Sequence, residues 1–342
     1  SNVSVYHHAG RLLSLGEVGL PYEISTTDLS TIGVHDFGGR ITGNVTAHPK
    51  IDPATGYLHF FGYEFAEPFL MYYVADASGA LVHAEGVGVG ASTMIHDFAI
   101  TDRDVVFWEM PVLFDLELAV QMVSEPASDV MPFVWTPSYG SRIGIMPLGG
   151  PASEIRWVEI DNCYVFHGVN AFRDGDDVVI DVCRLAKVFD GSSLGPPPAL
   201  HRWRVNTAGA SLTFADEVLS DRPADLPNID RRHVGREYRH SWRVEVTDSP
   251  DTVDLLGVVH YDARTGREQR WDPGAGRGSG EWLFVPRGDG EGDGFLLSYV
   301  YDAATDRSEL VVLDAQDVRA GPLATVPLPQ RVPYGFHAAF VV

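Results

Sequence analysis

The sequence predicts an all-β fold that closes as a β-propeller, and two observations predict it. Short runs rich in Val, Phe, Tyr and Trp recur along the 342 residues at intervals of roughly ten, and turn signals bound them. Four turns between such runs have explicit hairpin chemistry: ADASGA at 75–80, RDGDD at 173–177, YDARTGRE at 261–268 and YDAATDRS at 301–308. An all-β chain of this size, built from successive meanders, closes most simply as a propeller and less simply as a large sandwich.

Other segments carry weaker signals. The stretch 114–123, FDLELAVQMV, is the one fair helix candidate, and the charged stretch 220–237, SDRPADLPNIDRRHVGRE, looks like a connecting loop. The closing residues VPYGFHAAFVV, from 332 on, read as a terminal apolar strand behind a Pro-Tyr-Gly turn. Because no clear domain boundary interrupts the chain, we expect residues 1–342 to form a single domain.

Composition excludes several classes of function. The chain carries 47 acidic and 25 basic residues, a formal charge of −22 that repels phosphate backbones, so we expect no nucleic-acid partner. No apolar stretch is long enough for a transmembrane segment. Cys163 and Cys183 both lie in apolar, strand-like runs, which favours buried thiols in a reducing cytoplasm over a disulfide or a zinc site.

Four of the 13 histidines share one setting, in which each follows small or apolar residues at the edge of a buried run. They are His48 in NVTAHPKIDPATG, His96 in STMIHDFAIT, His167 in CYVFHGVNAF and His337 in VPYGFHAAFV. A single such histidine is more often a core residue than a ligand, but four of them spread over the chain favour a shared role. A propeller brings the inner strands of successive blades around one axis, and imidazole suits Fe, Zn, Cu and Ni.

These segments resemble a known family. TAHPKIDPATG, MIHDFAIT, YVFHGVNAF and VPYGFHAAF are similar, in this order, to the four metal-ligand segments of the carotenoid cleavage oxygenases, and the resemblance runs from HAGRLL near residue 8 to the last residue. It implies a seven-bladed β-propeller with the metal site on its axis and a few helices in loops that cap one face. It also implies one Fe(II) per chain, held by His48, His96, His167 and His337. The family is longer at the N-terminus, so we expect an N-terminal part of the fold to lie outside this sequence.

The resemblance also implies three carboxylates behind the histidines, because a metal-bound imidazole usually donates its other N–H to such a group. Glu17 in LLSLGEVGLPYE and Glu281 in GEWLFVPR match two of the family's three glutamates. The third position falls in ADLPNID, which offers Asp225. Aspartate is one methylene shorter, so direct contact requires a shift of the backbone, and otherwise a water must bridge the gap.

The chemistry that the resemblance implies is the cleavage of a conjugated C=C bond with O₂ to two carbonyl products, so a hydrophobic conjugated substrate and O₂ are the expected partners. Two branches compete: apocarotenoids and stilbenes of the resveratrol or lignostilbene type. In the stilbene branch a lysine commonly precedes the first glutamate and helps to bind a phenol; here that position is Gly16, which favours an apocarotenoid. Phe98, Phe166 and Phe336 adjoin the histidines and either line a substrate tunnel or pack in the core.

Two other functions remain as alternatives. A non-oxidative relative keeps the same iron site while it isomerises and hydrolyses an ester. A binding propeller, from a different functional class, would use the histidines only for structure and would hold no iron. We find no Gly-x-Ser-x-Gly element, no Walker loop and no paired catalytic carboxylates that would point to another reaction.

Overall fold

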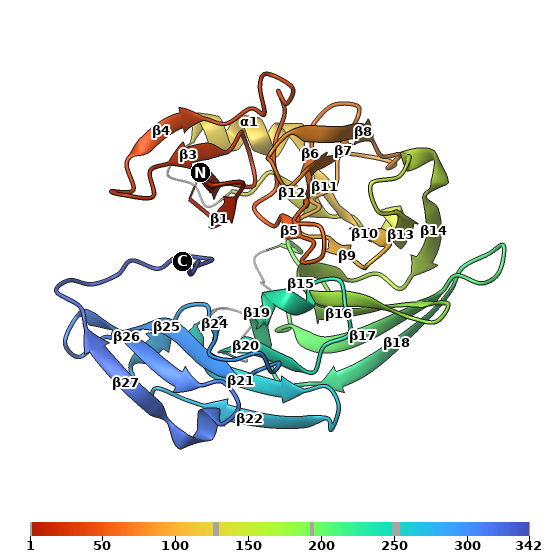
Figure 1. The fold of residues 1–342 in the computed structure, drawn as a ribbon. Helices are drawn as coiled ribbons and strands as arrows, with labels where there is room; N and C mark the ends of the chain where they lie inside the picture. The colour runs from red at the N-terminus through yellow and green to blue at the C-terminus, as the bar shows by residue number, and fades with distance from the viewer. Residues whose placement is uncertain (1, 126–129, 192–194, 248–253, 342) are drawn as a thin grey trace.

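Antiparallel sheets follow one another around a ring in the computed structural model, which describes residues 2–125, 130–191, 195–247 and 254–341 (Figure 1). Within these residues, six sheets have four or five strands each. Their first strands lie toward the centre of the ring and their last strands lie toward its rim (Figure 1). This is the arrangement of a β-propeller, so the all-β propeller prediction is confirmed.

The strands of the six sheets have the following bounds. The sheets are β1–β4 (Ser4–His8, Arg11–Leu15, Tyr22–Ile24, Thr31–Val34), β5–β8 (Lys50–Ile51, Leu58–Tyr63, Leu70–Ala75, Leu81–Gly86), β9-β10-β13-β14 (Ala99–Ile100, Asp104–Glu109, Ser141–Pro147, Arg156–Ile160), β15–β18 (Tyr164–Asp174, Asp177–Leu185, Ala199–Asn206, Thr213–Ser220), β19–β22 (Ala224–Ile229, His240–Val246, Leu255–Asp262, Arg267–Trp271) and β23–β27 (Arg277–Ser279, Leu283–Pro286, Gly294–Asp302, Arg307–Asp314, Pro322–Pro327). In the last sheet both β23 and β24 pair with β25.

The four predicted hairpins are all present. They join β7 to β8, β15 to β16, β21 to β22 and β25 to β26. In the first of them the Asp76 side chain accepts the backbone N–H groups of Ser78 and Ala80, at 2.9 and 3.1 Å, and Gly79 takes the positive φ that the turn needs. Local turn chemistry therefore sets these connections, as the sequence indicated.

Three expectations from the sequence are wrong. The resemblance implied seven blades, but the described residues form six, together with a two-stranded ribbon of β11 (Val112–Phe114) and β12 (Phe133–Trp135). The stretch 220–237 is not all loop, since it contains β19, the inner strand of its sheet. The residues from 332 to 341 form no strand; most of them are exposed, and no strand pairs with them.

The predicted helix at 114–123 is confirmed as α1, Leu116–Ser124, which lies between the two strands of the ribbon. Asp115 caps it by accepting the N–H of Leu118 at 3.0 Å. None of its residues is buried, and Leu116, Val120 and Val123 are strongly exposed.

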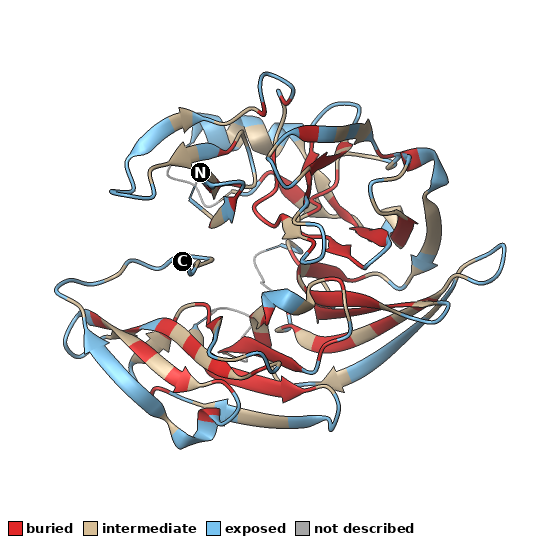
Figure 2. Ribbon diagram, in the orientation of Figure 1, coloured by how far each residue is buried: buried red, intermediate tan, exposed pale blue. Residues whose placement is uncertain are grey.

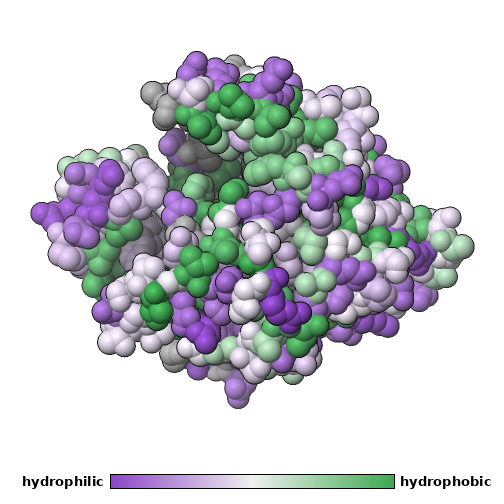
Figure 3. All heavy atoms as spheres, turned by 90° about the horizontal axis from the view of Figure 1, so that it is seen from above, coloured by the Kyte–Doolittle hydropathy of each residue, from purple (hydrophilic) through white to green (hydrophobic). Residues whose placement is uncertain are grey.

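In the space-filling view from above, hydrophobic patches alternate with hydrophilic ones across the surface (Figure 3). No helix in the described part of the chain has the length and apolar character needed to span a bilayer.

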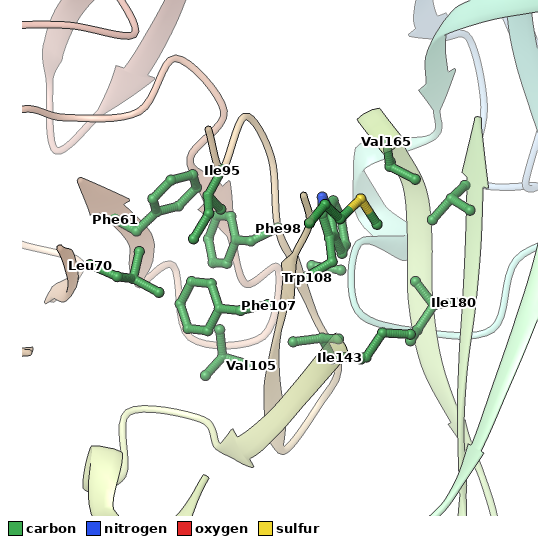
Figure 4. Close-up of a cluster of buried hydrophobic side chains, with 14 of the residues drawn as sticks. Phe61, Leu70, Ile95, Phe98, Val105, Phe107, Trp108, Ile143, Val165 and Ile180 are labelled. Carbon is green, nitrogen blue, oxygen red and sulfur yellow. The ribbon is translucent and has the colours of Figure 1, made fainter. Parts of the chain in front are cut away.

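The core lies between neighbouring sheets, and burial decreases from the inner and middle strands to the outer ones (Figure 2). Strand β20 is buried along its whole length, whereas the rim strand β27 is exposed along its whole length. The largest cluster contains Phe61, Phe98, Phe107 and Trp108 (Figure 4), with the Phe98 and Phe107 rings stacked at 5.6 Å. Each such side chain contributes roughly 1.5–3 kcal/mol by burial, which holds adjacent sheets face to face. Cys163 and Cys183 are buried and free.

Two buried histidines outside the predicted set are held in their neutral form. His59 Nδ1 lies 2.7 Å from the Tyr72 hydroxyl, and His260 Nε2 lies 2.9 Å from His240 Nδ1. Burial lowers the pKa of His59 and of His260 to about 4. Because both folded-state pKa values lie below the ordinary value of 6.5, the unfolded chain binds protons between these values that the folded chain does not.

Stability is therefore expected to be highest above about pH 6.5 and to fall as the pH drops toward the folded-state pKa values. Each of the two histidines removes about 2 kcal/mol of unfolding free energy between about pH 6.5 and pH 5. Urea unfolding at both pH values should show His260→Gln losing about 2 kcal/mol of that pH dependence. The same change at the exposed His7 is the control; equal pH dependence in both variants would contradict the assignment.

Candidate metal centre

The four predicted histidines lie together although 289 residues separate the first from the last. The His48 ring centroid is 4.6 Å from that of His96, 5.1 Å from that of His167 and 4.6 Å from that of His337. One ring nitrogen of each of His48, His167 and His337 lies within 4.8 Å of the other two. Nε2 of His96 lies 3.0 Å from Nε2 of His48. The fold thus brings all four imidazoles to one point.

Each histidine reaches this point from a different part of the fold. His48 and His96 stand in the loops just before the inner strands β5 and β9, and His167 lies within the inner strand β15. His337 belongs to the segment after β27, which runs inward between the first and last sheets (Figure 1). Its backbone N–H donates to the carbonyl of Val3 at 3.2 Å, so a hydrogen bond to the N-terminal part of the chain, not a strand ladder, anchors this histidine.

Three carboxylates stand behind three of the histidines. His96 Nδ1 donates to Glu17 Oε1 at 2.8 Å, and His167 Nδ1 donates to Asp225 Oδ1 at 2.9 Å. Nδ1 of His337 lies 3.5 Å from Glu281 Oε1. Each ring whose Nδ1 carries the proton presents an Nε2 lone pair, the state in which imidazole binds a metal. In the described part of the chain, no carboxylate partner is found for His48.

Asp225 reaches His167 directly because the backbone shifts at both residues. The β15–β16 register slips on either side of Gly168, which follows His167, and the β19–β20 register slips between Asp225 and Asn228. In the second bulge Leu226 has φ +50° and donates its N–H to Asp225 Oδ1 at 2.8 Å. Bulges of this kind re-aim side chains, and here they compensate for the shorter aspartate without a bridging water.

The donor set fits a transition-metal ion. Two nitrogens that bind one ion at about 2.1 Å and at a right angle to each other are about 3.0 Å apart, which is the separation of the His48 and His96 Nε2 atoms. Several imidazoles with no carboxylate among them suit Fe, Zn, Cu or Ni better than Ca²⁺ or Mg²⁺, which prefer oxygen ligands.

Burial shifts the pKa of two histidines of this cluster downward. It lowers the pKa of His48 well below 6.5, and the neighbouring histidines lower it further. Burial also lowers the pKa of His167 and outweighs the opposite effect of Asp225. At His96 burial again acts to lower the pKa, but the hydrogen bond and charge of Glu17 outweigh it, so the pKa is raised. The carboxylates thus act to raise the pKa of the imidazoles they contact, whereas burial acts to lower it.

The three predicted tunnel residues do not line one space. Phe98 is fully buried in the core, although it also lines a cavity of about 260 Å³ that reaches His48, His167 and His337. Phe166 packs edge-on against the His96 ring at 5.3 Å. Phe336 is 62% exposed and lines a separate cavity of about 420 Å³ between β25, β26 and the C-terminal segment.

Sequence reasoning missed the polar groups behind the carboxylates. Burial raises the pKa of the Tyr63 hydroxyl and of the Cys183 thiol, and the nearby charges of Glu17 and Asp225, respectively, raise it further. Asp97, adjacent to His96, accepts hydrogen bonds from two other segments. Tyr63 and Cys183 lie in apolar strand runs and gave no signal of their own, whereas an aspartate directly after the predicted ligand His96 was a signal that the sequence offered.

Comparisons with known proteins agree with this geometry. The family model of the retinal pigment epithelial membrane protein (RPE65) matches residues 1–342. A carotenoid cleavage oxygenase of Mycobacterium tuberculosis is 34% identical over 383 residues, which cover 98% of this chain and 76% of the relative. An isoeugenol monooxygenase of Pseudomonas nitroreducens is 33% identical over 367 residues, which cover 100% of this chain and 75% of the relative.

Solved structures are similar over the same extent. The lignostilbene dioxygenase of Pseudomonas brassicacearum superposes with a TM-score of 0.88 at 30% identity and covers 98% of this chain and 74% of its own. The cobalt-substituted apocarotenoid oxygenase of Synechocystis superposes with a TM-score of 0.87 at 27% identity and covers 99% and 74%. The shared structure therefore includes nearly all of this chain.

Replacing Asp225 by Asn tests the carboxylate behind His167. The amide is uncharged and can present its NH₂ group to Nδ1, so Fe(II) affinity is expected to fall about 10–100-fold in an anaerobic chelator competition. Asp216→Asn is the matched control, because Asp216 pairs with His201 Nδ1 at 2.7 Å outside the cluster. An unchanged affinity in Asp225→Asn, or an equal loss in the control, would remove this role from Asp225.

Proposed function

The chain belongs to the RPE65 and carotenoid cleavage oxygenase family, and we propose that it is an Fe(II)-dependent dioxygenase. Its reaction would cleave a conjugated C=C bond of an apocarotenoid-like substrate with O₂ and give two aldehyde or other carbonyl products. One observation carries the proposal: four imidazoles from distant parts of the chain meet at one point, with carboxylates behind three of them.

Four residues would hold one Fe(II) per chain: His48, His96, His167 and His337. When bound, Fe(II) supplies the redox chemistry that lets O₂ add across an electron-rich C=C bond. Glu17, Asp225 and Glu281 would keep three imidazoles in the tautomer whose Nε2 lone pair points inward. Because all four ligands are neutral, the site would keep the full charge of the ion.

The protein's other task is to place the double bond beside this site and to keep water away. The cavity of about 260 Å³ next to His48, His167 and His337 has apolar walls from Ile100 and Val169, among others. An extended apolar substrate held by such walls would lose its rotational freedom before the reaction, and this positioning supplies a large share of catalysis. No protein nucleophile or general base is needed for the cleavage itself.

An apocarotenoid is the favoured substrate because Gly16 provides no charge beside Glu17 for a phenol. The second candidate is a stilbene or lignostilbene, and the similarity to a lignostilbene dioxygenase supports it. A non-oxidative isomerase and a binding propeller are less favoured. A binding propeller would have no use for carboxylates that fix the tautomers of three clustered histidines.

Metal analysis of protein loaded anaerobically with Fe(II) tests the ligand set. Wild-type protein is expected to retain about one iron per chain, and His337→Ala is expected to lose most of it, because one of four ligands is removed from a segment that no strand pairing holds. His201→Ala, which changes a histidine outside the cluster, should retain the iron. Full retention by His337→Ala would remove this residue from the site.

O₂ uptake and product analysis test the reaction and the substrate class. Iron-loaded protein is offered an apocarotenal and resveratrol in parallel, and we expect O₂ consumption with aldehyde products from the apocarotenal. Cleavage of resveratrol alone would select the stilbene alternative instead. If the protein retains iron but consumes no O₂ in the presence of either compound, the proposed dioxygenase activity toward apocarotenoids and stilbenes is contradicted.

A further inference from the structure

Asp97 joins three of the four segments that carry the clustered histidines. It directly follows His96 in the chain, and only 1% of its surface is exposed. Its Oδ1 accepts from the Lys50 ammonium at 2.7 Å, and its Oδ2 accepts from the Gly168 N–H at 2.9 Å. Lys50 lies two residues after His48, and Gly168 lies one residue after His167. One carboxylate therefore bonds to positions beside three predicted ligands.

The Gly168 N–H is free to reach Asp97 because the chain bulges there. The pairing of β15 with β16 slips on both sides of Gly168, which takes its amide out of the regular ladder. A Cβ atom at this position would lie 2.9 Å from the Trp108 ring and 3.6 Å from Asp97 Oδ2. Glycine thus permits the close approach of the bulge to the carboxylate.

A buried charge at this place is costly unless its partners compensate for it. Asp97 has three donors: Lys50, Gly168 and the backbone N–H of Phe98, the last at 2.8 Å from Oδ1. All three approach a group that only accepts, so an ionised carboxylate satisfies them and a neutral amide cannot. An ion pair retained in such a setting contributes specific geometry more than stability.

We propose that Asp97 is a positioning residue that fixes the relative placement of His48, His96 and His167 and thereby sets the affinity and ligand geometry of the metal site. The inference rests on the proposed function, because it presupposes that these histidines bind a metal. Asp97 does not bond to the ring nitrogens of the histidines; it acts through the backbone N–H groups of Phe98 and Gly168 and through the Lys50 side chain. Binding sites of this kind tolerate displacements of only about 0.5 Å.

Asp97→Asn is the test variant, since it preserves the side-chain shape and turns one acceptor into a donor. The new NH₂ group would face one of the three donors, so the attached segment is expected to move. Co²⁺ is the probe, because a similar protein has been obtained with cobalt and because its visible absorption reports ligand number and geometry. We expect Co²⁺ affinity to fall at least about tenfold, with an altered visible spectrum.

Asp181→Asn is the matched control. Asp181 is a fully buried carboxylate that bonds to Arg202 at 2.8 Å and to the Tyr238 hydroxyl at 2.6 Å, and none of these groups belongs to the metal site. Its loss should lower thermal stability while Co²⁺ affinity and spectrum stay as in the wild type. An equal loss of affinity in the control would mean that general destabilisation is the cause, and the proposal would be overturned.

Lys50→Met keeps the inference testable if Asp97→Asn does not fold. It removes one of the three donors and leaves Asp97 bonded to Phe98 and Gly168, so a smaller loss of Co²⁺ affinity with an altered spectrum is expected. If the folded variants bind Co²⁺ with wild-type affinity and a wild-type spectrum, the role of Asp97 is overturned, whereas the proposed function is not. Absence of Co²⁺ and Fe²⁺ binding by the wild type would overturn the proposed function, and this inference with it.

Discussion

The arrangement depends on one constraint: four imidazoles must sit within a few ångströms of one another in a buried place, each with a lone pair directed inward. Imidazoles this close cannot all be protonated, and burial lowers the pKa of His48 and His167. Carboxylates on the outer nitrogens solve the orientation problem for His96 and His167. The inner loops and strands of the propeller, together with the segment after β27, bring these residues to one point although they are far apart in the chain.

His167 and Asp225 both stand at irregularities of their sheets. The register slips beside His167 and beside Asp225, and both bulges lie on inner strands. A regular strand would direct alternate side chains to the two faces of the blade, whereas a slipped one can direct a side chain along the edge, toward the centre. At these bulges the backbone N–H groups of Gly168 and Leu226 donate to the carboxylates of Asp97 and Asp225 instead of to the neighbouring strand.

The all-β class, the four hairpins and the helix at 114–123 could be predicted because each rests on local signals: alternation, turn residues and a helical period. The four histidines could be singled out by their shared local setting, whereas the carboxylates behind them came from the resemblance, which carries information that no local pattern contains. The blade count, β19 and the form of the C-terminal segment could not be predicted, because pairing between strands decides them. Tyr63 and Cys183 look like ordinary core residues in sequence, and only the fold sets their polar atoms against Glu17 and Asp225.

His337 is attached to the fold differently from the other three histidines, and this affects how the ion of the proposed metal site would exchange. His48 and His96 stand just before the inner strands β5 and β9, and His167 lies within β15, whereas His337 is held by its bond to Val3 and by the Ala338 N–H, which donates to Glu281 Oε2 at 2.8 Å. Segments with few such bonds open at the smallest free-energy cost. Local opening of this segment would move His337 away while the other three imidazoles stay in place, so in the proposed metal site it would give the ion a path to enter or leave.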